Sequence, residues 1–477
     1  MHHYLLMPKT IIYPTHRRFM SFVGLALLLC GVFVPVSQAQ SLPEARRETL
    51  LNGLRVVLWP RQDDYKVVLK LRIHSGAAFD LAGKSGTMAL LGDTLFPDTT
   101  ARDFIEKDLG GRLVVNTTQD TLDITMAGDA TSFEDLVNVL RSALTNATPE
   151  PERVNALREA RLKTLAPAQP DDLVLARLFG TFPYGRNSAG AAGELAKVDR
   201  NDLIFLRERF LNPNNATLVV AGNFAPDRAY RVIRQLLGNW RKSDTVVAST
   251  FRQHNTPDDS VLLVNEPNAE NAQVRLALRG LARNDKDYFA LALLTEIART
   301  RWQAALAEVP PSRFAVRNTA HTLPGYWLMS ADVRPADTAR ALSAARATLD
   351  ALAADGPTQA ELERARAALT AQITRQAGET EGVATFWLDG DTYRLPPLAE
   401  TLRGLNAMTP KNLQGTAFRL FRAVPVAVVI AGPADSLRSE LEKTAKIEIY
   451  GEKPAVSATP APKPKPVLPG PPAAIKP

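Results

Sequence analysis

The chain is poor in the side chains that build thiol and metal chemistry. Its only cysteine is Cys30, and only three of its six histidines, His74, His254 and His321, lie beyond residue 39. The chain after Cys30 therefore has no disulfide, no thiol nucleophile and no cysteine metal site. The three histidines are far apart in sequence, and none has a partner at ligand spacing. The sequence therefore predicts no catalytic or metal site made of histidine or cysteine side chains.

Other catalytic signatures are missing as well. No G-x-S-x-G segment occurs, so a serine hydrolase has no visible anchor. No G-x-x-x-x-G-K-[ST] or G-x-G-x-x-G segment lies between a strand and a helix, which excludes the usual phosphate-binding loops. Beyond residue 39 the chain has 54 Lys and Arg against 50 Asp and Glu, and no basic run is interleaved with aromatics. We therefore exclude nucleic acid as a partner.

The N-terminus predicts export. Lys9, Arg17 and Arg18 precede the apolar run FVGLALLLCGVFVPV (22–36), and Ser37-Gln38-Ala39 follows it. This arrangement is typical of a secretory signal that is cleaved before Gln40, and an uncleaved anchor is the alternative. Leu29 precedes Cys30 where a lipoprotein signal needs a small residue. We expect a periplasmic or cell-envelope protein without disulfides, stabilised by its core alone.

The C-terminus reads KPAVSATPAPKPKPVLPGPPAAIKP (453–477), which has almost nothing to bury. Its Pro, Ala and Lys composition predicts a disordered, polyproline-leaning tail. We expect membrane contact only through an uncleaved signal or through this basic tail.

Between these ends, two halves of the chain repeat one pattern, with matching segments about 205 to 210 residues apart. The strand-like runs 54–60, 67–76 and 216–226 match 261–267, 272–281 and 426–435, and the helical segments 133–144 and 152–165 match 336–354 and 359–377.

Strands and helices are mixed without regular alternation, which predicts an α+β fold. We expect two homologous sandwich domains, each a mainly antiparallel sheet with helices packed on one face. The predicted limits are a signal peptide (1–39), an N-terminal domain (40–245), a linker (246–257), a C-terminal domain (258–450) and a tail (451–477).

A helix is predicted after the run 67–76, where Met88, Leu91 and Leu95 recur at helical spacing. Positions 89, 92 and 93 share one face of it. That spacing can direct three side chains at one metal ion, as in H-x-x-E-H zinc peptidases. Here the positions hold Ala89, Gly92 and Asp93.

The order of these features resembles the pitrilysin/insulinase family of zinc metallopeptidases, which includes the mitochondrial processing peptidase. The resemblance covers about residues 45–448. It is carried by LNGLRVVLWP (51–60), the strand-to-helix piece 67–96, LGGRLVVNTTQDTLDITMAG (109–128), FPYGRNSAGAAGEL (182–195) and FLNPNNATLVVAGNF (210–224).

The resemblance implies where zinc ligands belong. It places the family's first His at Ala89, its Glu base at Gly92 and its second His at Asp93. Ala and Gly offer no ligand atom and no base, and one carboxylate does not make a zinc site. For the third ligand, one register gives Glu159 and another gives Leu162, so this assignment stays open. We expect no metal and no catalytic residue.

The resemblance also implies substrate-binding positions. The family's Arg and Tyr of the second half fall on Ala307 and Phe314, with Arg301 and Arg313 nearby. Tyr184 and Arg186 lie in the segment that resembles the family's Pro-Tyr-Gly-Arg, and a structural turn is the alternative interpretation of that segment.

These observations favour a catalytically silent, exported subunit, which closes the chamber and assists peptide binding for an active H-x-x-E-H partner of the same family. One alternative is a non-enzymatic envelope scaffold or peptide-binding module. A second alternative is a residual zinc peptidase that uses Asp93, Glu159 and His74.

Overall fold

The computed structural model describes residues 45–244, 257 and 260–451. The predicted signal peptide lies outside the described residues, as do the predicted linker except Pro257 and the predicted tail except Gly451. Residues 45–244 are called the N-terminal half and residues 260–451 the C-terminal half. No helix in these described ranges is long and apolar enough to cross a membrane.

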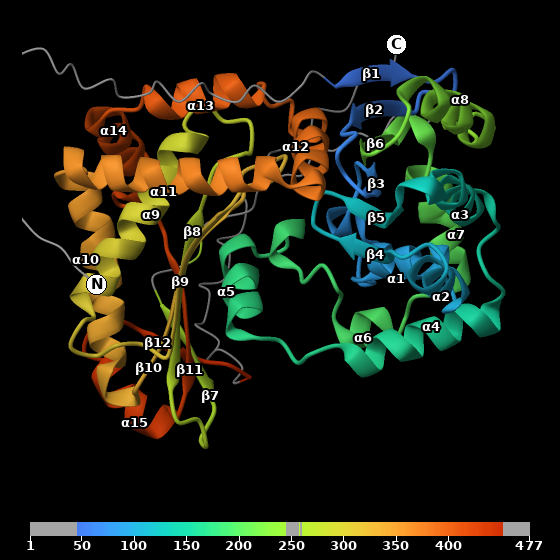
Figure 1. Cartoon of the computed structure of the whole chain (residues 1–477). Helices are drawn as coiled ribbons and strands as arrows, with labels where there is room; N and C mark the ends of the chain where they lie inside the picture. Colours follow the sequence, from blue (N-terminus) through green and yellow to red (C-terminus); the bar gives the residue numbers. More distant parts are fainter. Residues whose placement is uncertain (1–44, 245–256, 258–259, 452–477) are drawn as a thin grey trace, which may run out of the picture. The chain divides into compact units, whose positions relative to one another are not determined.

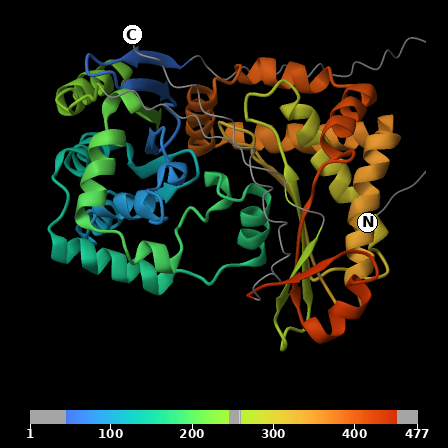
Figure 2. The same ribbon diagram turned by 180° about the vertical axis from the view of Figure 1, so that it is seen from behind.

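Each half contains one six-stranded sheet (Figures 1 and 2). The first has the order β1-β2-β6-β3-β5-β4, with β1 (Arg46–Thr49), β2 (Arg55–Pro60), β3 (Lys66–Ile73), β4 (Arg112–Thr117), β5 (Leu122–Asp129) and β6 (Ala216–Gly222). The second has the order β12-β7-β11-β8-β10-β9, with β7 (Val261–Asn265), β8 (Ala272–Arg279), β9 (Arg313–Thr319), β10 (Tyr326–Val333), β11 (Ala427–Gly432) and β12 (Ile447–Ile449).

The helices follow the predicted order. The N-terminal half has α1 (Thr87–Leu95), α2 (Thr100–Lys107), α3 (Phe133–Thr145), α4 (Pro151–Thr164), α5 (Pro170–Phe179), α6 (Ala192–Leu195), α7 (Arg200–Phe210) and α8 (Pro226–Leu237). The C-terminal half has α9 (Tyr288–Ala305), α10 (Thr338–Ala354), α11 (Gln359–Gly378), α12 (Thr380–Tyr393), α13 (Leu398–Asn406), α14 (Pro410–Phe421) and α15 (Ala434–Leu441). The predicted α+β class is confirmed.

The two sheets share one topology, in agreement with the repeat in the sequence. Strands β2 to β6 correspond in order to β7 to β11, and in each sheet the first and last of these strands pair in parallel. Gly222 and Gly432 end the corresponding strands β6 and β11. The remaining pairs are antiparallel except β12 with β7. The limits predicted for the two domains stay a prediction.

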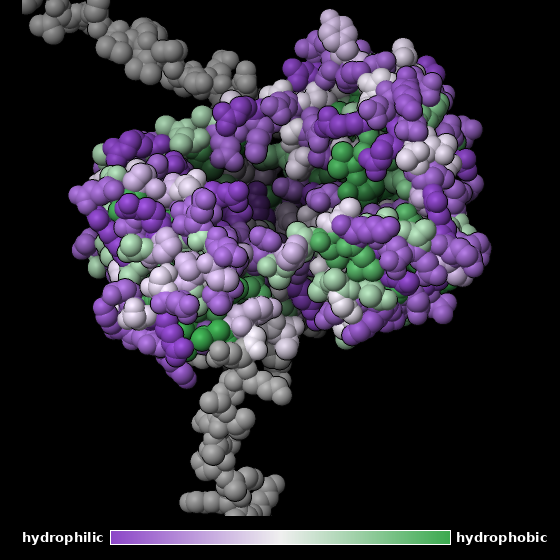
Figure 3. All heavy atoms as spheres, turned by 90° about the horizontal axis from the view of Figure 1, so that it is seen from below, coloured by the Kyte–Doolittle hydropathy of each residue, from purple (hydrophilic) through white to green (hydrophobic). Residues whose placement is uncertain are grey.

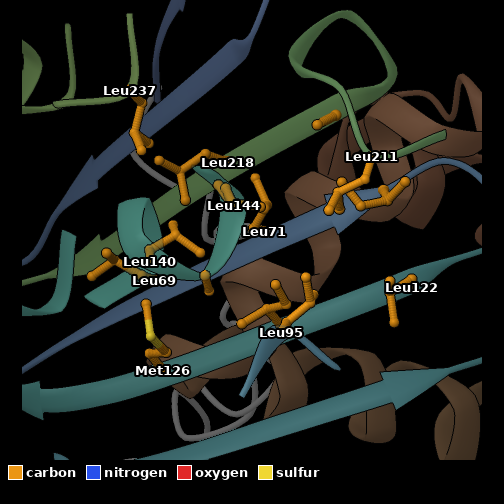
Figure 4. Close-up of a cluster of buried hydrophobic side chains, with 14 of the residues drawn as sticks. Leu69, Leu71, Leu95, Leu122, Met126, Leu140, Leu144, Leu211, Leu218 and Leu237 are labelled. Carbon is orange, nitrogen blue, oxygen red and sulfur yellow. The ribbon is translucent and has the colours of Figure 1, made fainter. Parts of the chain in front are cut away.

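Alternation along the strands directs one face of each sheet into a core. In the N-terminal half, Leu69 and Leu71 of β3 pack in one cluster with Leu140 and Leu144 of α3 (Figure 4). On the molecular face in Figure 3, hydrophilic residues predominate and hydrophobic residues gather in smaller areas.

The expectation of helices on one face of each sheet was incomplete, because each half also contributes one helix to the second face of the other sheet. Helix α5 packs on β8 and β11, where Val174 and Leu178 meet Ala277 and Val429. Helix α12 packs on β3 and β6, and its Leu388 joins a cluster with sheet residues. Segment periodicity cannot reveal which sheet a helix will cover.

The contact of α12 with β3 is strongly polar. Lys70 Nζ donates to Thr385 Oγ1 (2.7 Å), and Arg72 Nη1 donates to Asp389 Oδ1 (2.7 Å). Since side chains of β3 alternate, the neighbouring leucines enter the core while these cations face the helix. This face, not the core, carries specific electrostatic contacts between the halves.

Candidate functional site

Hydrogen bonds to the side chain of Asp80 fix the N-terminus of helix α1. Asp80 accepts hydrogen bonds from the backbone N–H groups of Gly86 (2.6 Å) and Met88 (2.7 Å). Burial raises the pKa of Asp80 to about 6, although both donors favour its ionised form. Gly86 has φ of +91°, a conformation that a side chain rarely adopts. The predicted helix is therefore present and its start is specified locally.

The face of α1 that would hold a metal is closed. Ala89 is only 3% exposed. A Cβ atom at Gly92 would lie 3.0 Å from Leu122 Cδ1 and 3.1 Å from Val115 Cγ1. Side chains of β4 and β5 thus occupy the space into which a longer residue at position 92 would extend.

The remaining position, Asp93, binds an arginine. Arg161 of α4 donates from Nε to Asp93 Oδ2 (2.6 Å) and from Nη2 to Asp93 Oδ1 (2.8 Å). The same Nη2 donates to the Ala89 carbonyl (3.3 Å). A guanidinium therefore contacts two of the three motif positions.

Sequence reasoning missed Arg161, which lies between the two registers considered for the third ligand. Glu159 is exposed, and Leu162 is half-buried against the core. An arginine between the two positions considered for the third ligand was the one available signal. It had no meaning until α4 was placed against α1.

Replacement of Arg161 by alanine is expected to lower the free energy of unfolding by about 2 kcal/mol, because Asp93 loses charge-assisted hydrogen bonds while it stays partly buried. Urea unfolding of Arg161→Ala, Asp93→Ala and the double variant forms a thermodynamic cycle. The expected coupling energy is about 1 kcal/mol. A coupling energy near zero would show that the pair contributes nothing.

Tyr184 lies in a buried network instead of an open cleft. Its hydroxyl donates to Asp120 Oδ1 (2.7 Å) and accepts from the Leu323 N–H (3.2 Å). Asp120 Oδ2 also accepts from the Thr322 N–H (2.8 Å) and lies 3.3 Å from His321 Nδ1. Burial disfavours the charge on Asp120, but the hydrogen bond from His321 and the others hold its pKa below the usual value. This network joins a turn of each half.

The structural alternative for the Pro-Tyr-Gly-Arg segment is therefore the one that this geometry favours. Burial raises the pKa of Tyr184 above its usual range, so the phenol stays protonated. Arg186 is half-buried, and its carbonyl accepts from Gln119 Nε2 (2.5 Å).

The structure brings Ala307 and Phe314 together. Both line a cavity of about 470 Å³ between the end of α9 and the start of β9, with Leu306, Pro310 and Pro311. The Phe314 ring lies 4.7 Å from that of Trp302, centroid to centroid. Arg301, which lies nearby in sequence, forms an ion pair with Glu361 (2.7 Å). Ala307 and Phe314 thus line an apolar cavity, where the resemblance would place an arginine and a tyrosine.

Comparison with known proteins shows which family the chain resembles. The family described as Peptidase M16 inactive domain matches residues 197–369. The beta subunit of a probable mitochondrial-processing peptidase of Arabidopsis thaliana is 24% identical over 268 residues, which are 53% of this chain and 50% of that protein. An uncharacterized zinc protease of Mycobacterium leprae is 24% identical over 429 residues, 82% of this chain and 93% of that one. These matches support a catalytically degenerate member of the M16 (pitrilysin/insulinase) family. The resemblance in sequence predicts the altered zinc motif at Ala89, Gly92 and Asp93.

Solved structures show the same M16 fold. A protease from Helicobacter pylori matches with a TM-score of 0.74 and 18% identity, over 82% of this chain and 100% of that one. The first half of the periplasmic protease PqqL from Escherichia coli matches with a TM-score of 0.69 and 16% identity, over 84% of this chain and 94% of that one. The chain spans about half the length of the Arabidopsis subunit that it matches.

The residues of this M16 chain do not fit the zinc ion of the family. Within residues 45–244, 257 and 260–451, no group of three or more His, Cys, Asp or Glu side chains is placed to hold a metal. Asp93 is bound to Arg161, Glu159 is exposed, and His74 Nε2 lies 2.9 Å from Thr217 Oγ1. The set proposed for a residual zinc peptidase is not assembled.

His74 gives a pH-dependent prediction. Burial, followed by the charge of Arg55, lowers the pKa of His74 to about 4. In an unfolded chain this pKa is about 6.5, so the unfolded chain takes up the proton first as the pH falls. We expect stability to decrease between pH 6.5 and pH 4, by about 3 kcal/mol at the lower end.

Denaturant unfolding at pH 7.5 and pH 4.5 checks this contribution. His74→Gln can still hydrogen-bond Thr217 but does not titrate, so its loss of stability over this interval should be smaller by about 2 kcal/mol. Equal losses in the two proteins would mean that another group dominates.

Proposed function

We propose that this chain is an exported, catalytically silent subunit of an M16 metalloendopeptidase. In this role it closes the peptidase chamber and helps to bind the peptide, while an active H-x-x-E-H partner supplies the zinc site. The observation that carries the proposal is the ion pair of Arg161 with Asp93. The chain has kept the helix of the zinc motif and uses its face for a structural contact.

Two comparisons support the partner and the location. The Arabidopsis relative is, by name, one subunit of a processing peptidase. The E. coli structure is, by its description, a periplasmic protease. The first supports a role beside a second subunit, and the second supports an exported location.

Affinity purification of the tagged full chain from its native host tests this proposal. We expect a stoichiometric protein of similar length that carries H-x-x-E-H. Peptidase activity of that protein should rise when the chain is added. The matched control is the same partner with its motif glutamate replaced by glutamine, which should stay inactive in the mixture.

Two other outcomes would replace the proposal. A chain that purifies alone, or with envelope components that include no peptidase, would indicate the scaffold or peptide-binding alternative. Stoichiometric zinc in a chain prepared without chelators, with activity that Asp93→Ala abolishes, would establish the residual peptidase.

A further inference from the structure

The two sheets end in edge strands that differ in availability. On β4, Arg102 Nη1 donates to the Leu113 carbonyl (2.7 Å), and Arg112 forms an ion pair with Glu381 of α12. The chain itself thus occupies part of this edge. On β9, which ends the second sheet, the main chain of the strand pairs only with β10 among the described residues. An unpaired edge of this kind can accept an additional strand.

The sheet face beside this open edge is rich in arginine. Arg313 and Arg317 of β9 lie on the same face, because side chains of a strand alternate. The pairing register places Ala315 opposite Ser330, and Ser330 opposite Arg275 of β8. The residues between them on β9, Phe314 and Val316, pack with the core on the other face.

Few carboxylates balance these arginines. Arg275 binds Asp171 (2.5 Å) and Asp332 (2.7 Å), and Asp332 is the residue that the pairing register places opposite Arg313. Arg317 shares Asp171 and stays half-exposed. Arg313 is exposed and forms no ion pair with any residue in the described ranges. The face therefore has positive charge available at its outer edge.

One polar side chain on the same sheet face, one strand further in on β10, has no partner within the described ranges. Ser330 is 8% exposed, and its Oγ has no hydrogen-bond partner among the described residues. On β10, Ser330 is paired on one side with Ala315 of β9 and on the other side with Arg275 of β8. On the opposite side of β9, the cavity lined by Ala307 and Phe314 offers about 470 Å³ of apolar space.

We propose that β9 is a docking strand for an extended acidic peptide. Two carboxylates four residues apart face Arg313 and Arg317, with a small residue between them opposite Ala315. Alternate side chains of such a strand point to opposite faces, so the residues in between are apolar and one enters the cavity beside Phe314. This names the substrate class of the proposed peptide-binding role and rests on that role.

The test uses the full chain and a blocked, fluorescein-labelled probe peptide of sequence Glu-Val-Ala-Val-Glu-Thr, followed by fluorescence anisotropy at low salt. We expect saturable binding that weakens as salt is added, because the arginines are partly exposed. The R313E/R317E variant should bind at least about tenfold more weakly, as expected when charges across an interface become alike. The R364E/R375E variant carries the same charge change on exposed residues of α11 and should bind like the wild type.

Two further peptides separate strand docking from simple charge attraction. A peptide with Lys in place of both Glu residues should not bind, and a peptide N-methylated at alternate residues should lose most of its affinity. Equal binding by R313E/R317E, or by either modified peptide, would overturn the proposal.

The assay contains no partner, so it separates this inference from the proposed function. Binding by the isolated chain supports the docking strand even if no active subunit exists. Conversely, an active subunit found without peptide binding at β9 would leave the subunit role standing and remove this inference.

Discussion

Replacement of Arg72 by methionine is expected to lower the free energy of unfolding by about 3 to 5 kcal/mol, as when one partner of a buried ion pair is removed. The Arg72 side chain is 7% exposed. It binds Asp123 of β5 through Nε and Nη2 (both 2.8 Å), and Asp389 of α12 through Nη1 (2.7 Å). Burial disfavours its charge, yet the two carboxylates hold its pKa above the usual value. The variant would leave both carboxylates without their cation.

Arg112→Met is the matched control, because Arg112 also binds a carboxylate of α12 but is 57% exposed. An exposed ion pair contributes less than about 1 kcal/mol. Urea unfolding of both variants at low and high salt measures the difference. If the two variants lost equal stability, the Arg72 network would not hold α12 on the first sheet as described.

Restoration of the zinc motif is expected to damage the fold before it creates a site. Gly92→Glu should lower the free energy of unfolding by about 4 kcal/mol, from crowding against Val115 and Leu122 and from a buried charge. Gly92→Ala is the control, since its single methyl group meets the same neighbours at 3.0 to 3.1 Å. Its crowding is partly offset by about 1 kcal/mol of better helix propensity, so we expect a change within about 1 kcal/mol.

The complete motif variant, A89H/G92E/D93H, extends this prediction to the metal. Arg161 would then place its positive charge beside two histidines, which disfavours a dication there. Elemental analysis after dialysis against zinc is expected to find substoichiometric metal. One tightly held zinc per chain, with a stability like that of the wild type, would show that the site needs only its ligands.

The regular elements were predictable because their signals are local. The run 67–76 became β3, and the segments 133–144, 152–165, 336–354 and 359–377 became α3, α4, α10 and α11 with ends shifted by only a few residues. Apolar periodicity reports which face of a segment will be buried, and it does so without knowledge of the partner. The matched order of the two halves then predicted the repeated sheet.

The candidate site was predictable only in what it lacks. The family resemblance predicts that Ala89, Gly92 and Asp93 stand at the positions of two ligands and a base, and this prediction needs no tertiary information. What replaced the ligands could not be predicted, because the contact between Asp93 and Arg161 joins residues 68 positions apart. The same holds for His321, which had no partner in sequence and meets Asp120 of the other half.

The sequence by itself determined the α+β class, the duplication, the family resemblance and the loss of the zinc ligands. The tertiary structure alone decided that α5 and α12 each cover the other half's sheet, that a guanidinium binds Asp93, and that β9 pairs only with β10 among the described residues. The physical reason is the range of the interactions. Helix and strand patterns depend on neighbours within a few residues, whereas ion pairs and sheet edges depend on which distant segments the fold brings together.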